Sequence, residues 1–130
     1  MDLRRRTPYA LAVILIIGIG LLTRLPVFPL PWGLVKPLGS ILWGAMVYCL
    51  VRTGWPGLRL ASSAMIAAVI AAGVELSQLW HPEALDAFRR TKIGVLLIGR
   101  FFSCVDIADY VFGIVTACLA ELAVCAGRMR

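Results

Sequence analysis

A few polar side chains stand where the rest of the sequence is strongly apolar. Glu75 and Gln78 are three residues apart near the end of a long apolar run, so a helix would place both on one face. Asp106 and Tyr110 are four residues apart in a later run and would also share a face. Ionisable groups inside a membrane helix cost about a few kcal/mol each. Such residues therefore mark a functional site or an internal brace.

Two arginines extend this pattern. Arg24 ends the first apolar run, and Arg89 follows the third. If the long helices alternate in direction, the C-terminal ends of the first and third and the N-terminal end of the fourth lie on one side of the membrane. We therefore predict one polar cluster at a single membrane level. Its members are Arg24, Glu75, Gln78, Arg89, Asp106 and Tyr110.

Three interpretations of the cluster remain open. Arg24 could pair with Glu75 or Asp106 as a structural brace, which is common in membrane bundles. The cluster could instead bind an anionic or sugar-like headgroup. A third possibility is an intramembrane enzyme that uses Glu75 or Asp106 as a general base. No nucleophile paired with a base is visible, so no catalytic residue is assigned.

Metal and cofactor sites have little support in the sequence. His81 is the only histidine, and none of the four cysteines forms a C-x-x-C pair. Apart from a weak mixed set of His81, Glu83 and Asp86, which suits an ordinary helix start better, no metal ligands gather. We predict neither a metal site nor a cofactor.

The amino-acid composition indicates that much of the protein surface contacts lipid rather than water. Hydrophobic residues make up 61% of 130 residues, and the mean hydropathy is +0.90. A soluble domain of this size cannot bury so much apolar surface, so lipid contact is the simplest explanation. The formal net charge of +6 comes from short basic groups between apolar runs, which suits a membrane surface and argues against nucleic-acid binding.

The apolar runs predict an all-α, polytopic transmembrane bundle that forms one integral-membrane domain over residues 1–130. Four spanning helices are expected at about residues 7–24, 38–52, 58–80 and 104–125. Residues 25–37 carry four prolines and predict an interfacial loop. Residues 82–92 predict a short helix lying on the membrane, and residues 93–102 a re-entrant or interfacial segment too short to span.

Glu121 and the chain termini complete the topology. Glu121 lies near the end of the last span, where snorkelling toward the interface would explain it. Basic residues divide almost evenly between the two sides, so they orient the chain only weakly. The triple arginine Arg4, Arg5 and Arg6 before the first span favours cytoplasmic termini.

A known pattern resembles the spacing of these residues. Glu75-x-x-Gln78 followed by Asp106-x-x-x-Tyr110-x-x-Gly113 resembles the VanZ-like membrane proteins, in which an asparagine takes the place of Tyr110. That group is associated with low-level glycopeptide resistance by an unknown mechanism. The resemblance therefore implies a link to the cell envelope or to lipid-linked glycans, without identifying an enzyme.

A second resemblance covers nearly the whole chain. It is to a small bacterial membrane family catalogued only as a domain of unknown function. The matching pieces are Gly20-Leu21-x-x-Arg24, Gly39-x-x-Leu42-Trp43, Glu75-x-Ser77-Gln78-Leu79, Arg89-x-Thr91-x-x-Gly94, Gly99-x-x-Phe102, Asp106, Tyr110 and Gly113. Ser40 departs from the pattern, because an acidic residue is expected there. The resemblance adds Thr91 to the candidate cluster and implies a multi-pass protein of the bacterial inner membrane.

These observations lead to one hypothesis with two rivals. We expect a non-enzymatic protein of the bacterial cytoplasmic membrane whose polar cluster binds an anionic lipid or a lipid-linked envelope precursor. The first rival is an accessory subunit, docked to a partner protein or to a second copy through small residues of the third helix. The second rival is the lipid-headgroup enzyme described above.

Overall fold

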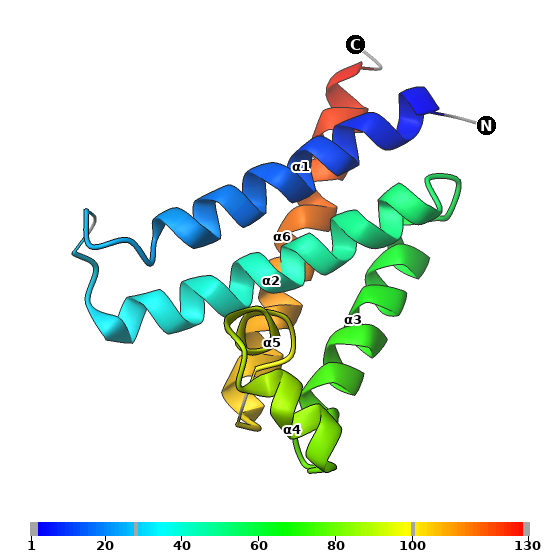
Figure 1. The fold of residues 1–130 in the computed structure, drawn as a ribbon. Helices are drawn as coiled ribbons and strands as arrows, with labels where there is room; N and C mark the ends of the chain where they lie inside the picture. The colour runs from blue at the N-terminus through cyan, green and yellow to red at the C-terminus, as the bar shows by residue number, and fades with distance from the viewer. Residues whose placement is uncertain (1–2, 28, 100, 129–130) are drawn as a thin grey trace.

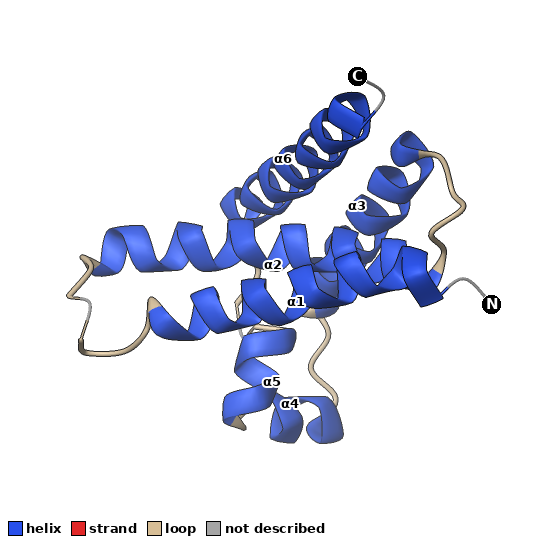
Figure 2. Ribbon diagram, turned by 90° about the horizontal axis from the view of Figure 1, so that it is seen from above, coloured by secondary structure: helices blue, strands red, loops and turns tan. Residues whose placement is uncertain are grey.

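The structure is a computed structural model that describes residues 3–27, 29–99 and 101–128. These residues form helices joined by short connections, without any strand in the described ranges (Figures 1 and 2). The helices are α1 (Leu3–Leu22), α2 (Trp32–Gly54), α3 (Leu60–Ser77), α4 (Glu83–Arg89), α5 (Lys92–Leu97) and α6 (Cys104–Arg128). Within the described chain, α1, α2, α3 and α6 are long and apolar enough to cross a membrane, which confirms the predicted all-α bundle with four spanning helices.

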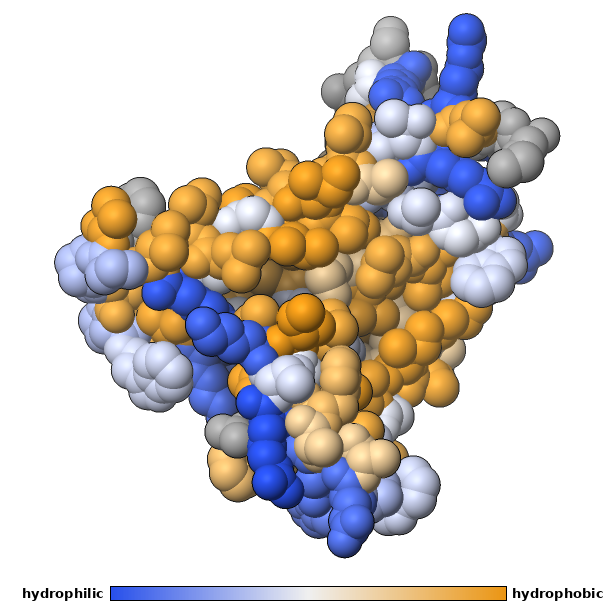
Figure 3. All heavy atoms as spheres, viewed as in Figure 1, coloured by the Kyte–Doolittle hydropathy of each residue, from blue (hydrophilic) through white to orange (hydrophobic). Residues whose placement is uncertain are grey.

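The apolar surface is what a lipid environment requires. Leu11, Ile14 and Leu15 of α1 are each at least 60% exposed. Figure 3 shows an apolar band between two hydrophilic ends, one near the termini and one around α4. In water this surface would drive aggregation, whereas in a bilayer it contacts acyl chains. The chain is therefore a membrane protein.

Two glycines set the close crossing of α2 and α6. A Cβ atom added to Gly44 of α2 would overlap the carbonyl group of Tyr110. A Cβ atom added to Gly113 of α6 would overlap the carbonyl group of Ile41. Small residues let helix backbones approach closely in lipid, where there is no hydrophobic drive to hold helices together. This crossing places the start of α6 beside the middle of α2.

The face of α3 that packs into the bundle follows a four-residue repeat. Ser63, Ala67, Ala71 and Glu75 are all buried, at no more than 2% exposure. Residues four apart lie on one helical face, and this face meets α2 and α6. The repeat explains why the single carboxylate of α3 is enclosed rather than exposed to lipid.

The predicted proline-rich loop was too long. α2 already begins at Trp32, so Pro37 lies inside a helix. Pro31 stands immediately before that helix, as a residue with its fixed φ readily does. At Pro37 the helix loses one hydrogen bond, which would run to the carbonyl of Gly33. Spanning helices tolerate such a loss where the freed group can be satisfied locally.

Other predicted boundaries also shift. α1 begins at Leu3 rather than residue 7, and α3 ends at Ser77 rather than residue 80. The interfacial helix predicted for residues 82–92 ends at Arg89, where a second short helix, α5, soon begins. α5 occupies the first part of the predicted segment 93–102, in which residue 100 lies outside the described residues.

Candidate functional site

Glu75 is the centre of a closed hydrogen-bond network. Its carboxylate is fully buried, and Oε1 accepts a hydrogen bond from the backbone N–H of Ser103 at 2.7 Å. Oε2 accepts from the Tyr110 hydroxyl at 3.1 Å and from Nε2 of Gln78 at 3.2 Å. Among the described residues no cation contacts this carboxylate. Glu75 thus fastens the C-terminal end of α3 to the beginning of α6.

Gln78 extends the network to the segment after α5. Its Nε2 also donates to the backbone carbonyl of Ile98 at 2.6 Å, while its Oε1 is buried without a partner in the described chain. Gly99 follows with a φ of 74°, in the left-handed region that favours glycine. A Cβ atom there would lie 2.7 Å from Nε2 of Gln78, so the residue must be small as well.

Asp106 and Tyr110 connect α6 to α2. The carboxylate Oδ1 of Asp106 lies 3.3 Å from the ammonium group of Lys36. The ring of Tyr110 packs against that of Trp43 with centroids 4.8 Å apart and a tilt of 45°, a favourable aromatic arrangement. Lys36 was not among the predicted cluster residues, because it lies in the loop predicted for residues 25–37.

Arg24 stands apart from these pairs. Its guanidinium passes over Gly39 of α2, whose added Cβ would lie 3.4 Å from Nη2. The ion pair considered between Arg24 and Glu75 or Asp106 is not formed, and within the described residues the guanidinium of Arg24 has neither a hydrogen bond nor an ion pair. Lys36 takes the place that Arg24 could have filled beside Asp106. The arginine is therefore available to a ligand.

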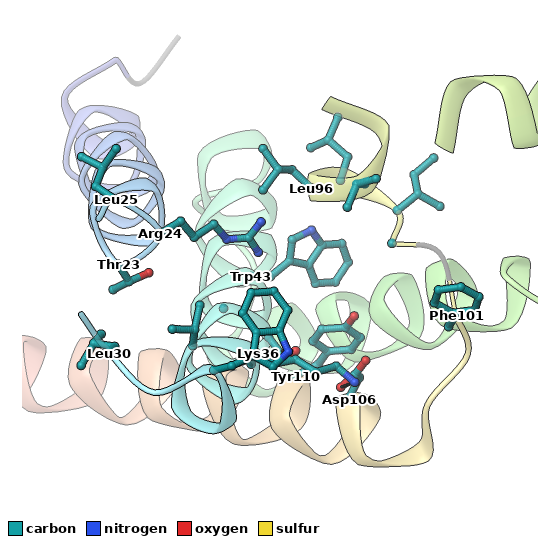
Figure 4. Close-up of a pocket in the computed structure, with 18 of the residues that line it drawn as sticks. Thr23, Arg24, Leu25, Leu30, Lys36, Trp43, Leu96, Phe101, Asp106 and Tyr110 are labelled. Carbon is teal, nitrogen blue, oxygen red and sulfur yellow. Dashed lines mark hydrogen bonds and ion pairs between the residues drawn. The ribbon is translucent and has the colours of Figure 1, made fainter. Parts of the chain in front are cut away.

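One cavity of about 710 Å³ lies between α1, α2, α5 and the start of α6, and its lining includes Arg24, Lys36, Asp106 and Tyr110. Figure 4 shows Arg24 pointing toward Trp43, with Leu96 of α5 on one side and Tyr110 and Asp106 on the other. The charged groups that line the cavity, within the described chain, are Arg24, Lys36 and Asp106. Their formal sum is positive, so the cavity favours an anion.

Arg89 and Thr91 have local roles away from the cavity. Arg89 is 3% exposed, and its guanidinium donates to the carbonyls of Ser77 and Trp80 beyond the end of α3. Basic side chains at a helix C-terminus satisfy its free carbonyls in this way. The hydroxyl of Thr91 accepts the N–H of Gly94 and so caps α5. Neither residue meets Glu75 in the part of the chain described.

Gly94 completes this turn between α4 and α5. A Cβ atom at Gly94 would overlap the carbonyl group of Phe88, so only glycine fits there without movement. The pattern Arg89-x-Thr91-x-x-Gly94 is thus a structural corner, which positions α5 as one wall of the cavity. The predicted single cluster therefore included two residues, Arg89 and Thr91, that the structure places apart from the others.

Asp86 supports the same corner from α4. Its Oδ1 lies 3.0 Å from Nη1 of Arg89 and 3.2 Å from Nδ1 of His81. Desolvation by burial acts to raise the pKa of Asp86, but the hydrogen bonds from His81 and Arg89 outweigh it and lower the pKa below its ordinary value. No group of three or more potential metal ligands is present in the described ranges.

A second polar network, which the sequence did not reveal, lies at the other end of the bundle. The guanidinium of Arg52 on α2 pairs with the carboxylate of Glu121 on α6, and both side chains are at most 10% exposed. The hydroxyls of Tyr9 and Tyr48 donate to the same carboxylate at 2.6 and 2.7 Å. The interpretation of Glu121 as a snorkelling residue was wrong, because its partners come from distant parts of the sequence.

The two ends of the bundle differ in whether their charged side chains have hydrogen-bonding partners. At the Arg52 end, donors and acceptors satisfy one another, and Arg52 also bonds the carbonyl of Leu58. At the cavity end, Glu75 is satisfied while Arg24 is not. The cavity can therefore bind an anion, and its described lining shows no nucleophile held against a base.

Comparison with known proteins places this chain in a family. A family model described as a protein of unknown function (DUF2809) matches residues 30–114, about two thirds of the chain, so the chain belongs to that family. The match includes Glu75, Gln78, Asp106 and Tyr110, whereas Arg24 lies before it. The likeness to VanZ-like proteins stays a prediction. No solved structure matches the fold significantly.

Proposed function

Because membership in this family assigns no activity, we propose a function from the geometry of the cavity. The protein binds the anionic headgroup of a membrane lipid or of a lipid-linked envelope precursor, and it does so without catalysis. The observation that carries the proposal is the unpaired guanidinium of Arg24 beside a cavity of about 710 Å³. An arginine presents a planar set of donors that matches a phosphate group.

Lys36 and Asp106 supply the remaining charges. Lys36 is 57% exposed and only loosely held by Asp106, so its ammonium group can turn toward a second anionic oxygen. Asp106 is then left to accept a hydrogen bond from a hydroxyl or amine of the same headgroup. This set of groups suits a phosphate that carries a hydroxyl or amino substituent, as glycerol or sugar phosphates do.

The position of the cavity agrees with a headgroup ligand. It lies at the end of the bundle opposite the termini, where α1 ends and α2 begins (Figure 1). Trp32 at this end and Trp55 at the other are both more than 60% exposed, as expected for rings at the headgroup level. With cytoplasmic termini, which the triple arginine favours, the cavity would open to the outer leaflet of a bacterial inner membrane.

The brace interpretation applies to a different part of the cluster. Gln78, Ser103 and Tyr110 all donate to the Glu75 carboxylate and so tie α3 to α6. These residues are therefore assigned to the support of the cavity rather than to the ligand. Arg24 and Lys36 are assigned to the ligand.

Thermal unfolding in neutral detergent tests this proposal. Adding phosphatidylglycerol should raise the midpoint of the wild type more than phosphatidylcholine does, since a ligand bound only by the folded state stabilises it. Arg24→Gln should remove the difference between the two lipids. Arg59→Gln, which deletes an exposed arginine at the other end of the bundle, should keep it. An equal response of the wild type to both lipids would count against the proposal.

A further inference from the structure

An apolar groove of about 240 Å³ adjoins the polar cavity. Its walls come from α1, α2 and α5, and it holds almost no polar surface other than Arg24. The groove-lining residues that it does not share with the cavity are Ile16, Ile17, Gly20, Leu21, Leu42, Met46 and Ile93. Arg24, Gly39, Trp43, Leu96 and Leu97 line both spaces, so the two are continuous.

The groove exists because α5 stands away from the two helices that it faces. In the described residues, the backbone of α5 closely approaches only that of α4 among the helices. Its Leu96 and Leu97 nevertheless face α1 and α2 across the gap. Protein interiors are normally close-packed. A gap of this size next to lipid is therefore suited to hold the apolar chain of a lipid.

Glycines keep the groove open. A Cβ atom at Gly20 would touch only the side chain of Leu42, at 3.9 Å, and would otherwise enter open space. Gly39 lies at the junction of the two spaces, where Arg24 passes over it. The guanidinium therefore sits where a polar headgroup would meet its own apolar chain.

From this continuity we infer the class of ligand. The occupant is an intact membrane amphiphile, whose phosphate binds Arg24 and one of whose apolar chains lies between α1, α2 and α5. This inference rests on the proposed headgroup binding and adds the chain to it. A water-soluble phosphate compound would leave the groove empty.

The groove takes up a lipid's acyl chain because of where the headgroup is bound, and not because the groove is more apolar than the surrounding lipid. Acyl chains are as well solvated by lipid as by apolar side chains, so the groove gains little from burial alone. A chain enters because the headgroup is held beside it, and α5 keeps that chain apart from the surrounding lipid. Occupation of the groove should therefore depend on Arg24.

Photo-cross-linking in bilayer nanodiscs tests the inference. The probe is a phosphatidylglycerol that carries a diazirine in one acyl chain, and mass spectrometry maps the labelled peptides. We expect labelling of residues 16–21 and 93–97, reduced about tenfold or more by Arg24→Gln, since the charge-assisted hydrogen bonds to the phosphate are lost. Arg59→Gln should leave this labelling unchanged. Labelling of the outward-facing Val69 and Leu119 should not respond to either change.

A substitution in the groove separates failure of this inference from failure of the proposed function. Gly20→Phe should fill the groove and lower cross-linking there, while Gly18→Phe, whose Cβ meets open space on the same helix, should not. Soluble glycerol 1-phosphate, which offers the phosphate without an acyl chain, should still raise the thermal unfolding midpoint of the Gly20→Phe variant. If labelling in the groove ignores Arg24→Gln while the thermal response to phosphatidylglycerol still needs Arg24, the chain inference is wrong and headgroup binding stands. If neither depends on Arg24, both are wrong.

Discussion

Arg52 of α2 and Glu121 of α6 form a buried bidentate ion pair, in which Nε and Nη2 of the arginine donate to the two carboxylate oxygens. Tyr9 of α1 donates to the same carboxylate, so the pair joins three spanning helices. Bidentate pairs of this kind are among the stronger polar contacts in proteins. This network closes the end of the bundle that holds both termini (Figure 1).

Breaking this pair should destabilise the fold strongly. We expect Glu121→Ala to lower the free energy of unfolding by about 3–5 kcal/mol, because it leaves the Arg52 charge buried without its partner. Denaturant unfolding in detergent micelles measures the change. Glu83→Gln, an exposed carboxylate on α4, is the matched control and should stay within about 0.5 kcal/mol of wild type. The double variant Arg52→Met with Glu121→Leu should recover much of the loss, and no recovery would show that charge burial is not the cause.

Glu75 should act on stability rather than on lipid binding. Glu75→Ala leaves the N–H of Ser103 and the hydroxyl of Tyr110 without an acceptor, which should cost about 2 kcal/mol or more. Tyr110→Phe removes a single hydrogen bond and should cost about 1 kcal/mol. Thermal unfolding with and without phosphatidylglycerol measures both effects. A Glu75→Gln protein of normal stability that no longer responds to this lipid would overturn the division between brace and ligand site.

The α2–α6 crossing should tolerate no side chain at its glycines. Gly113→Ala brings a methyl group against the carbonyl of Ile41 and should destabilise by about 1–3 kcal/mol, because two backbones must separate. Gly73→Ala on α3 meets open space and should be neutral or stabilising by up to about 1 kcal/mol. The difference in denaturant midpoint between the two variants is the measurement. Equal effects would contradict the close crossing.

The corner at α4 should weaken in acid. The pKa of Asp86 is lower in the folded protein than its ordinary value of 3.8, so its stabilising contribution is present above that value. The contribution is lost as the pH falls through the lower, folded value, when the ion pair to Arg89 is neutralised. Comparing thermal midpoints from about pH 6 down to about pH 3, we expect the gap between wild type and Asp86→Asn to close toward acid. A gap that widens would have the wrong sign.

The spanning helices could be predicted because lipid imposes a simple rule on sequence. Long apolar runs identify α1, α3 and α6 almost completely. The start of α2 was missed because Pro37 and Lys36 interrupt its run, although a spanning helix tolerates one missing N–H near its beginning. Local breakers are thus weaker signals in lipid than in water.

The site was only partly accessible to sequence reasoning. Helical spacing correctly put Glu75 with Gln78 and Asp106 with Tyr110 on common faces, and alternating helix directions brought the two pairs together. Spacing could not show that Lys36 rather than Arg24 meets Asp106, since this depends on how far α2 extends. Nor could it show that Arg89 turns back to Ser77 or that Glu121 finds Arg52, because these contacts join residues 12 and 69 positions apart.

Native mass spectrometry of the gently solubilised protein tests the central claim most directly. Wild type, Arg24→Gln and Arg59→Gln would be purified side by side, and the bound species released and weighed. The headgroup account predicts a defined phosphate-containing lipid on wild type and on Arg59→Gln, and its loss from Arg24→Gln at unchanged thermal stability in lipid-free detergent. The same adduct on all three proteins, or bare protein throughout, would contradict it.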